Sequence, residues 1–556
     1  MKHLHQVRAR LIQPGSRFEI ETKLIRGVET RTWKHAPKTL REVFERTVEF
    51  RERKYLVFEN ERLSYAEHHA EVCTLANVLA DRFDVRKGDR IAIAMRNFPE
   101  YATIFWATLS IGAIVVPLNS WWSGRELDFA LHDSGAKVLF ADGQRFDSLQ
   151  PFLTTLNFVG MVCVRDEKSG VLNYRDLLSD GVAATTLPRV SLKPDDGATL
   201  LYTSGTTGQP KGVLGTHRNA CSAIWTTLFC LRASRELSAA SEPNAKDQKC
   251  ALITTPLFHV IGCLSGLLIQ TFVGAKIVLM YKWDANTALE LIEREQISTS
   301  TMVPAMLWQL IEAQTQHPRD VSSLERLSYG GAPAPAELFT RLERCFPNVL
   351  LMTGFGMTET SSPSTHGFGE YLKRTPTSAG LPPPVCDIKA MNERGTEVTR
   401  GENGELWIRG PNVVDGYWQR PDATAETFND GWVKSGDIGY IDEDGNVFIV
   451  DRIKDMVIRG GENVYCVEVE NAIVAYGDIV EAAVIGLAHE TLGEEVAAAV
   501  LLERGACIDE QALRAFLKRH LAAFKIPTVF EFRTTDLPRN ATGKVLKSVL
   551  RTQMGC

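Results

Sequence analysis

Short apolar runs alternate with amphipathic stretches along the first part of the chain. Ser64 can cap a helix whose Glu67 can bond back to it, so a helix is expected from there to about Phe83. The same alternation then predicts a strand at 90–95, a helix at 100–111, a strand at 113–118, a helix near 124–134 and a strand at 137–140. Strand–helix alternation of this kind is typical of a doubly wound, largely parallel α/β sheet.

The alternation continues in the middle of the chain, where strands are expected at 251–255, 276–280, 297–302, 324–328 and 349–352 and helices at 218–231 and 285–295. Residues 233–249 are expected to form a surface excursion. Residues 250–275 carry no formal charge and are long enough to span a bilayer. Because Pro256, His259 and Gln270 interrupt them, we expect a buried strand, a loop and a core helix, and no transmembrane segment.

From residue 378 the pattern changes to short alternating strands, such as 404–410 and 445–450. These strands indicate a β-rich subdomain at about 378–452. Beyond it, helices are expected at 467–475 and 509–521 and strands at 482–486 and 496–502. We therefore expect a large N-terminal domain over 1–452 and a small α+β C-terminal domain over 453–556.

Composition narrows the class of protein. The 556 residues are 44% hydrophobic and 23% charged, which supports a sizeable core, and the net charge of −6 gives no reason to expect a nucleic-acid partner. The eleven cysteines are scattered, and the closest pair, Cys221 and Cys230, is not a C-x-x-C motif. This distribution argues against a zinc cluster and fits reduced thiols. The first residues also lack the apolar core of a signal peptide, so a cytoplasmic location is expected.

The strongest chemical signal is the segment 202–212, which an apolar run enters. It combines Ser and Thr hydroxyls, three glycines and Lys211. Glycines let backbone N–H groups approach an anion, hydroxyls donate hydrogen bonds and the lysine adds positive charge, so the segment suits a polyphosphate. It is not the usual P-loop pattern, because Pro210 stands where the second glycine would be. A plain surface turn is the alternative.

Five segments in order carry a family resemblance: 202–212, 354–359, 435–437, 451–455 and 538–544. In this order they resemble the acyl-CoA synthetase branch of the adenylate-forming (AMP-binding) superfamily, over about residues 40 to 550. The resemblance implies that a carboxylate attacks the α-phosphate of ATP bound with Mg²⁺, giving an acyl-adenylate and pyrophosphate. The thiol of coenzyme A then takes the acyl group and releases AMP. It also implies that the C-terminal domain is mobile.

The resemblance assigns roles to residues of the nucleotide site. The phosphate loop would bind the β- and γ-phosphates through Thr203, Ser204, Gly205, Thr206, Thr207, Gly208 and Lys211. Other nucleotide-binding positions are Gly331, Ala332, Pro333, Phe355, Gly356 and Met357, where 331–333 and Phe355 would enclose adenine. Relatives commonly have Tyr at position 355. Thr358 would donate to the α-phosphate, and Glu359 would hold Mg²⁺, which prefers oxygen ligands.

The remaining roles lie further along the chain. Asp437 would accept from the ribose hydroxyls, unless it only shapes a turn, and Arg452 would reach the ribose or a phosphate. Lys454 occupies the hinge position, with an ordinary linker lysine as the alternative. Lys544 would stabilise negative charge during adenylation. After the hinge motion, the tunnel for the pantetheine arm of coenzyme A would be lined at Gly460 and Gly461.

The acid itself is the least determined part. His259 would border the acyl pocket and gate it, or be structural, with Val303, Trp308, Gly330, Gly354 and Met357 expected nearby. Uncharged residues around His259 favour a medium- or long-chain fatty acid. The alternatives are a bulky cyclic acid (aromatic, terpenoid or steroid) and, less favoured, an amino acid. The expected partners are thus a small carboxylic acid, ATP and coenzyme A, and a homodimer is left open.

Overall fold

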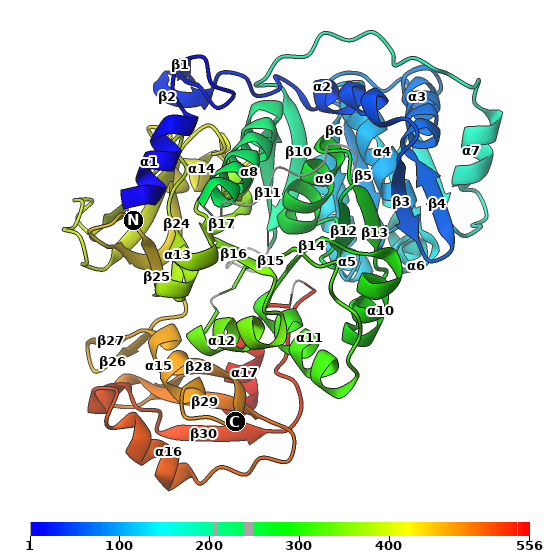
Figure 1. Cartoon of the computed structure of the whole chain (residues 1–556). Coiled ribbons are helices and arrows are strands. Elements are labelled where there is room, and N and C mark those ends of the chain that lie inside the picture. Colours follow the sequence, from blue (N-terminus) through cyan, green and yellow to red (C-terminus); the bar gives the residue numbers. More distant parts are fainter. Residues whose placement is uncertain (1, 204–208, 238–247, 333, 542, 556) are drawn as a thin grey trace.

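The computed structural model describes residues 2–203, 209–237, 248–332, 334–541 and 543–555. In these residues the chain forms two large α/β sheets, a β-rich sheet and a small C-terminal α+β unit (Figure 1). The C-terminal unit, orange to red, lies below the rest of the molecule in that view. The mixed α/β fold expected from the alternation of strands and helices is confirmed.

The first large sheet contains the strands predicted near the start of the chain. Its described strands run in the order β11-β10-β6-β5-β7-β8-β9. Their bounds are β5 (Arg90–Ala94), β6 (Ile114–Pro117), β7 (Val138–Asp142), β8 (Gly160–Val164), β9 (Leu172–Asn173), β10 (Gly197–Thr203) and β11 (Lys211–Thr216). Neighbours are parallel except β10 and β11, which form an antiparallel hairpin.

Helices packed around this sheet are α3 (Tyr65–Asp81), α4 (Pro99–Ser110), α5 (Gly124–Ser134), α6 (Gly143–Leu149) and α7 (Tyr174–Asp180). The capping box predicted for the first of them is confirmed. The Glu67 N–H donates to Ser64 Oγ at 3.2 Å, and the Ser64 N–H donates to Glu67 Oε2 at 2.8 Å. These two bonds satisfy N–H groups that the helix start leaves without partners.

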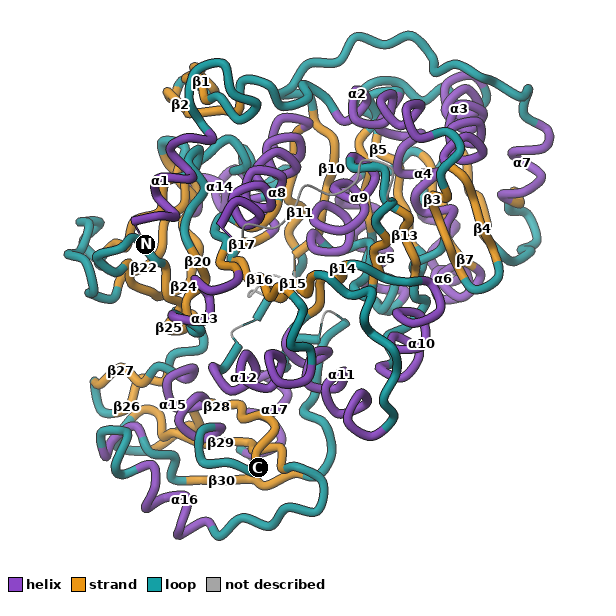
Figure 2. Tube along the Cα trace, viewed as in Figure 1, coloured by secondary structure: helices purple, strands orange, loops and turns teal. Residues whose placement is uncertain are grey.

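The second large sheet has the described strand order β19-β16-β15-β14-β12-β13-β3-β4. Its bounds are β3 (Lys54–Phe58), β4 (Glu61–Ser64), β12 (Cys250–Ile253), β13 (Lys276–Leu279), β14 (Thr299–Met302), β15 (Arg326–Gly330), β16 (Leu350–Gly354) and β19 (Gly367–Phe368). Its helices include α8 (His217–Leu237), a π-helix (Ile261–Leu268), α9 (Ile269–Phe272), α10 (Ala285–Glu295), α11 (Pro304–Gln316) and α12 (Ala336–Cys345). Figure 2 shows the helices flanking the strands.

Two smaller sheets follow along the chain. The β-rich sheet contains β20 (Ser378–Gly380), β21 (Asp387–Met391), β22 (Gly404–Arg409), β23 (Phe428–Asn429), β24 (Trp432–Ile441) and β25 (Val447–Arg452). The C-terminal sheet contains β26 (Val457–Arg459), β27 (Glu462–Val464), β28 (Ile479–His489), β29 (Gly493–Leu502) and β30 (Val529–Arg533). Near them lie α13 (Gly369–Arg374), α14 (Pro421–Thr427), α15 (Cys466–Val474), α16 (Glu510–Leu517) and α17 (Lys547–Met554).

The N-terminal segment is ordered into regular elements. It forms α1 (Lys2–Leu11), a hairpin of β1 (Ile20–Ile25) and β2 (Val28–Trp33), and α2 (Leu40–Glu45). The expected surface excursion from residue 233 is wrong for 233–237, which continue α8. Ala233 is buried there in a cluster with Leu4 and Val7 of α1. Tertiary contact with a distant helix therefore extends α8; residues 238–247 lie outside the described residues.

The uncharged segment 250–275 is buried inside the protein. It supplies β12, the π-helix and α9, as expected from its breaks. In the described part of the chain, no helix is both long and apolar enough to cross a membrane. Near the start of the π-helix, Gly262 packs against the Pro256 carbonyl group. A Cβ at residue 262 would lie only 2.2 Å from the Pro256 carbonyl oxygen, so this contact requires glycine. His259 follows β12, which is parallel to β14, so it lies on the side of the sheet where the carboxyl ends of strands bind ligands.

Candidate active site

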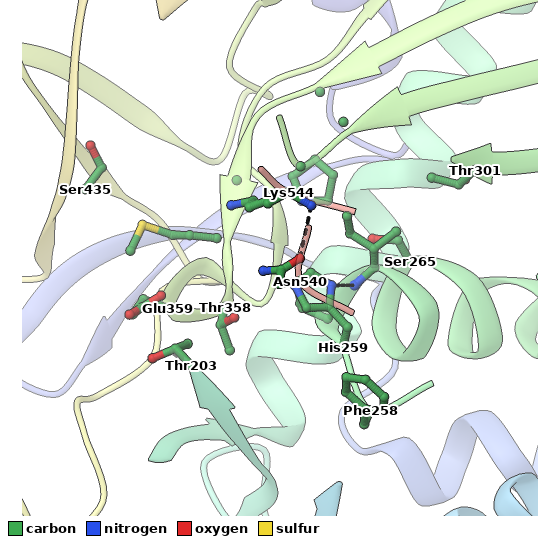
Figure 3. Close-up of a pocket in the computed structure, with 18 of the residues that line it drawn as sticks. Thr203, Phe258, His259, Ser265, Thr301, Thr358, Glu359, Ser435, Asn540 and Lys544 are labelled. Carbon is green, nitrogen blue, oxygen red and sulfur yellow. Dashed lines mark hydrogen bonds between the residues drawn. The ribbon is translucent and has the colours of Figure 1, made fainter. Parts of the chain in front are cut away.

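A large cavity lies where the four structural units meet. It has a volume of about 1030 Å³, and its lining comes from both large sheets, the β-rich sheet and the C-terminal loop around Lys544. Figure 3 shows Lys544 and Asn540 between Thr358 and Glu359 on one side and His259 and Ser265 on the other. The predicted site residues that line it are Thr203, Lys211, His259, Gly331, Gly356, Met357, Thr358, Glu359, Arg452, Lys454 and Lys544.

The two ends of the predicted phosphate loop are held together by the β10–β11 hairpin. Thr203 and Lys211 are cross-strand partners, and Thr203 Oγ1 donates to the Lys211 carbonyl oxygen at 3.4 Å. The loop thus joins two antiparallel strands, whereas a P-loop joins a strand to a helix. The predicted positions between them, Ser204, Gly205, Thr206, Thr207 and Gly208, lie outside the described residues.

Glu359 and Thr358 occupy a short 3₁₀ turn that follows β17 (Gly356–Met357). The Glu359 side chain is buried, with 6% of the residue exposed, and Tyr417 Oη donates to its Oε1 at 2.9 Å. Burial raises the pKa of Glu359, and the hydrogen bond from Tyr417 opposes this. Lys211 Nζ lies 5.0 Å from the centroid of the Tyr417 ring. Tyr417 therefore connects the phosphate-loop lysine to the buried carboxylate.

The β-rich sheet contributes a paired Asp and Arg through its register. Asp437 of β24 is the cross-strand partner of Arg452 of β25, and Arg452 Nε donates to Asp437 Oδ1 at 2.9 Å. Asp437 is 3% exposed, and its Oδ2 is buried without a hydrogen-bond partner in the part of the chain that the structure describes. Burial raises the pKa of Asp437, and the Arg452 charge opposes this. A buried carboxylate oxygen without a donor is the kind of group that a ligand hydroxyl satisfies.

Lys544 reaches the cavity on a tight turn of the C-terminal unit. The Asn540 N–H donates to the Lys544 carbonyl oxygen at 2.9 Å, and the Lys544 N–H donates to Asn540 Oδ1 at 3.0 Å. Gly543 has a φ of +81°, and a Cβ there would lie 2.8 Å from Val303 Cγ2 in the N-terminal part of the chain. Glycine therefore permits both the turn and its close contact with Val303.

The surroundings of Lys544 lower its pKa. Burial and the nearby Arg452 charge lower the pKa of Lys544 to about 8, although Asp437 and Glu359 act in the opposite direction. Burial and the Lys544 charge lower the pKa of His259 to about 4, so this imidazole is neutral near pH 7. His259 Nδ1 accepts from the Ile261 N–H at 3.3 Å, at the start of the π-helix.

Several predicted residues do not line the cavity. Phe355 packs between hydrophobic clusters of the β-rich sheet, and Ala332 is not part of the lining. The exposed turn between β26 and β27 holds Gly460 and Gly461, which are also outside the cavity. Of the expected acyl neighbours, Gly330 and Gly354 line it, whereas Trp308 packs against the α11–α12 core and Val303 contacts Gly543 instead. Pro333 lies outside the described residues.

Sequence reasoning missed a polar group of lining residues on the acyl side. Four belong to β14 and β15: Thr299, Thr301, Arg326 and Ser328. Others come from α8, the π-helix and α9: Thr227, Leu231, Ser265 and Gln270. The signal for the strand residues was the alternation in β15, where Leu327 and Tyr329 are buried and the residues between them are partly exposed.

An α/β cleft at the carboxyl ends of strands, with a lysine from the C-terminal unit in its lining, is the arrangement expected of an acid-activating enzyme. A model of the AMP-binding enzyme family matches residues 43–418, and a model of its C-terminal domain matches residues 468–544. The chain therefore belongs to the AMP-binding enzyme family. It is an acid–thiol ligase, an acyl- or aryl-CoA ligase, as its resemblance implied.

Relatives in this family include ligases for different acids. The chain is 36% identical to a feruloyl-CoA synthase from Amycolatopsis sp. over 89% of this chain and 94% of that protein. It is 35% identical to a 2-succinylbenzoate–CoA ligase from Geobacillus kaustophilus, covering 88% and 92% of the two chains. It is 33% identical to the long-chain-fatty-acid–CoA ligase FadD13 of Mycobacterium tuberculosis, covering 88% and 93%.

Solved structures agree with this fold over nearly the whole chain. ATP-bound MatB from Rhodopseudomonas palustris superposes with a TM-score of 0.81 at 29% identity, covering 93% of this chain and 99% of that one. The o-succinylbenzoate CoA synthetase MenE from Bacillus subtilis, in complex with its acyl-adenylate, gives a TM-score of 0.77 at 30% identity, with 92% and 97% covered.

Proposed function

We propose that this ligase activates its acid as an acyl-adenylate at the junction of Thr358, Glu359 and Lys544, and then passes the acyl group to coenzyme A. The observation that carries this proposal is the position of the Lys544 cation, which lies in the cavity where the phosphate side and the acyl side meet. A cation there offsets the repulsion between the attacking carboxylate and the α-phosphate, and it stabilises the charge that gathers between them. No nucleophilic side chain is required.

The other nucleotide roles follow from the same geometry. Thr358 would donate to the α-phosphate, and Lys211 would hold the departing pyrophosphate. Asp437 is not itself part of the cavity lining, but its neighbours Gly436 and Arg452 are, so its buried Oδ2 would accept from a ribose hydroxyl. Arg452 fixes Asp437 Oδ1 and so leaves Oδ2 for the ligand. Each contact places one charge or donor against one part of ATP.

Glu359 fits a role in holding Mg²⁺. In the described residues no cluster of three or more His, Cys, Asp or Glu side chains could hold a metal. Mg²⁺ is commonly bound by one or two carboxylates together with substrate phosphates. The buried Glu359, oriented by Tyr417, matches that requirement. When bound, Mg²⁺ would neutralise phosphate charge.

We also propose a rotation of the C-terminal domain between the two half-reactions and a cytoplasmic location. We place the division between domains at 452/453, with Lys454 at the hinge, and infer that rotation about it brings Gly460 and Gly461 to the cavity for the thiol step. Their exposed position outside the cavity fits the adenylation arrangement, in which Lys544 occupies the site. A cytoplasmic enzyme is the simplest setting for ATP and coenzyme A. The oligomeric state, a monomer or a homodimer, is for solution measurements to determine.

For the acid, the polar acyl wall supports a cyclic, planar substrate over a fatty acid. Thr301, Ser328 and Gln270 would lie against the acyl group, and burying a plain hydrocarbon chain there would leave their polar atoms without partners. The cavity is also narrow beside Gly331, where an added Cβ would lie 3.0 Å from Ile261 Cδ1. A flat ring passes such a constriction more easily than a bulky one. Feruloyl-CoA synthase heads the relatives above, which agrees with an aryl acid.

The test separates the two half-reactions. Lys544→Ala should lower pyrophosphate release with an aryl acid by about 100- to 1000-fold. The same variant should form thioester from a synthetic acyl-adenylate and coenzyme A at close to the normal rate. Lys518→Ala, an exposed lysine of the same domain, is the matched control and should change neither step. Unchanged pyrophosphate release in Lys544→Ala would refute the assigned role. Comparable turnover of palmitate and cinnamate would refute the preference for a planar acid.

A further inference from the structure

Strand β15 presents a charged residue to the acyl side of the cavity. Along it, Leu327 and Tyr329 belong to the hydrophobic core behind the sheet, whereas Arg326 and Ser328 line the cavity. The register places Thr299 beside Arg326 and Thr301 beside Ser328, so the same face of β14 continues this wall. A period of two along both strands therefore explains why these polar side chains share one surface.

The guanidinium group of Arg326 has little to balance its charge. Its Nε donates to Thr299 Oγ1 at 3.3 Å, and among the residues that the structure describes it forms no ion pair. The adjacent Glu325 points away from the cavity and pairs with Lys249 at 2.6 Å. Burial and the Arg235 charge lower the pKa of Arg326 to about 10, and the Glu325 charge opposes this shift. Arg326 is half-buried in the wall of the cavity, and a partly desolvated cation without an ion-pair partner is one that an anionic ligand would stabilise.

Arg326 lies at the end of the acyl region remote from Lys544. Gly543 and Lys544 approach Val303, which directly follows β14, and Gly330 is at the same end of β15. Arg326 begins β15, so it lies about 13 Å back along the strand at the usual rise per residue. The opposite wall is α8, where Thr227 and Leu231 line the cavity and Arg235 is one turn further along the same helix face.

We propose that the acid activated by this enzyme carries a second carboxylate, which Arg326 binds at the end of the cavity remote from Lys544. The inference rests on the proposed adenylation at Lys544, which fixes where the reacting carboxylate lies. A guanidinium group can bind a carboxylate through two parallel N–H bonds, and the Ser328 hydroxyl lies on the same face to donate to it. Because the Arg326 side chain extends toward the substrate, the two carboxylates would be at most about 13 Å apart.

The experiment compares acids that differ only in the distal group. Cinnamate, 4-carboxycinnamate and 4-methoxycarbonylcinnamate are matched in shape, as are octanoate, octanedioate and its monomethyl ester. With pyrophosphate release as the readout, the diacid should exceed its methyl ester in kcat/KM by about 10- to 100-fold, the range expected for a hydrogen bond between charged groups. Arg326→Met should remove this preference, keep activity on the ester and leave the KM for ATP unchanged. Arg344→Met, an exposed arginine on α12, is the matched control.

The outcomes distinguish this inference from the function on which it rests. Equal rates for diacid and ester, or equal losses on both in Arg326→Met, would overturn the role of Arg326 while the ligase activity stands. Activation of other acids with no activity on either diacid would also overturn it. If no acid of any kind supported pyrophosphate release, the proposed adenylation itself would fail. If Arg326→Met does not fold, the role of Arg326 is tested by the ratio of kcat/KM for the diacid to kcat/KM for the ester, measured in the unaltered protein and in Arg326→Lys.

Discussion

The two halves of the cavity are built in different ways. In the nucleotide half, each functional group comes from a turn or a strand end, such as Thr358 and Glu359 on one 3₁₀ turn and Lys544 on another turn. In the acyl half, the groups come from the faces of regular elements, such as Arg326 of β15 and Thr227 of α8. ATP makes the same demands whatever the acid, so its half can be a set of short local motifs. The acid is fitted by the side-chain pattern of several strands and helices.

This difference predicts two kinds of mutational effect. A change in the nucleotide half should lower the rate with every acid by the same factor, because it acts on a step common to all of them. A change in the acyl half should alter the order of preferred acids and leave the KM for ATP unchanged. The predictions below test this division, beginning with the largest effect.

Glu359→Gln should have the largest effect of these. Removing the buried carboxylate should lower kcat/KM by about 100-fold with every acid, and raised Mg²⁺ should restore part of the activity. The measurement is a Mg²⁺ titration of pyrophosphate release with two unrelated acids. Glu443→Gln, on an exposed turn of the β-rich sheet, is the control. A loss confined to one acid would contradict the division of the cavity.

The pH dependence of adenylation should follow Lys544. Since its pKa in the free enzyme is about 8, the cation is present below that pH and is lost as the pH rises through it. We expect kcat/KM for pyrophosphate release to reach its plateau at about pH 7 and below, to fall as the pH rises through about 8, and to fall tenfold per pH unit well above 8. Two acids should give the same descending limb. A profile that is level up to pH 10 would show that the charge of Lys544 is not required.

Tyr417→Phe tests the support behind the metal-binding carboxylate. It removes the hydrogen bond to Glu359 Oε1 and keeps the ring that faces Lys211. Loss of such an orienting contact should raise the Mg²⁺ concentration needed for half-maximal activity by about tenfold, equally for all acids. Tyr440→Phe, a tyrosine of β24 stacked on Phe448, is the control. An unchanged Mg²⁺ requirement with reduced thermal stability would make Tyr417 merely structural.

The contrast between the nucleotide half and the acyl half of the cavity also explains which residues could be predicted from the sequence. Thr203 was identified from the residue types of the phosphate loop, whereas Lys544 and Glu359 were assigned through the family resemblance that short motifs carry; all three line the cavity. The helix at Ser64 was also predictable, since its capping box spans only three residues. These are local patterns, and local physical chemistry is sufficient to read them.

The missed features depend on contacts between distant segments. Tyr417 lies 58 residues from Glu359, and the contact arises because the segment around Tyr417 packs against β11. Likewise, α8 continues through Ala233 because of its contact with α1. Arg326 lay within a correctly expected strand, but which face of that strand meets the cavity depends on its neighbours in the sheet.

Ser328→Ala gives the smallest expected effect and tests the acyl half alone. The hydroxyl lies on the cavity face of β15, two residues from Arg326, so its loss removes one neutral donor near the distal end of the acid. A net contribution of about 0.5–1 kcal/mol, the lower part of the usual range for a neutral hydrogen bond, corresponds to a reduction of about two- to fivefold in kcat/KM for acids with a polar distal group. For acids without a polar distal group, kcat/KM should rise or stay the same. In the wild-type protein such an acid leaves the Ser328 hydroxyl without a hydrogen-bond partner, and the alanine side chain removes that cost. The KM for ATP should not change. If instead all acids lost activity by the same factor, Ser328 would act through the common step, and the boundary between the two halves would lie deeper in the cavity than β15 suggests.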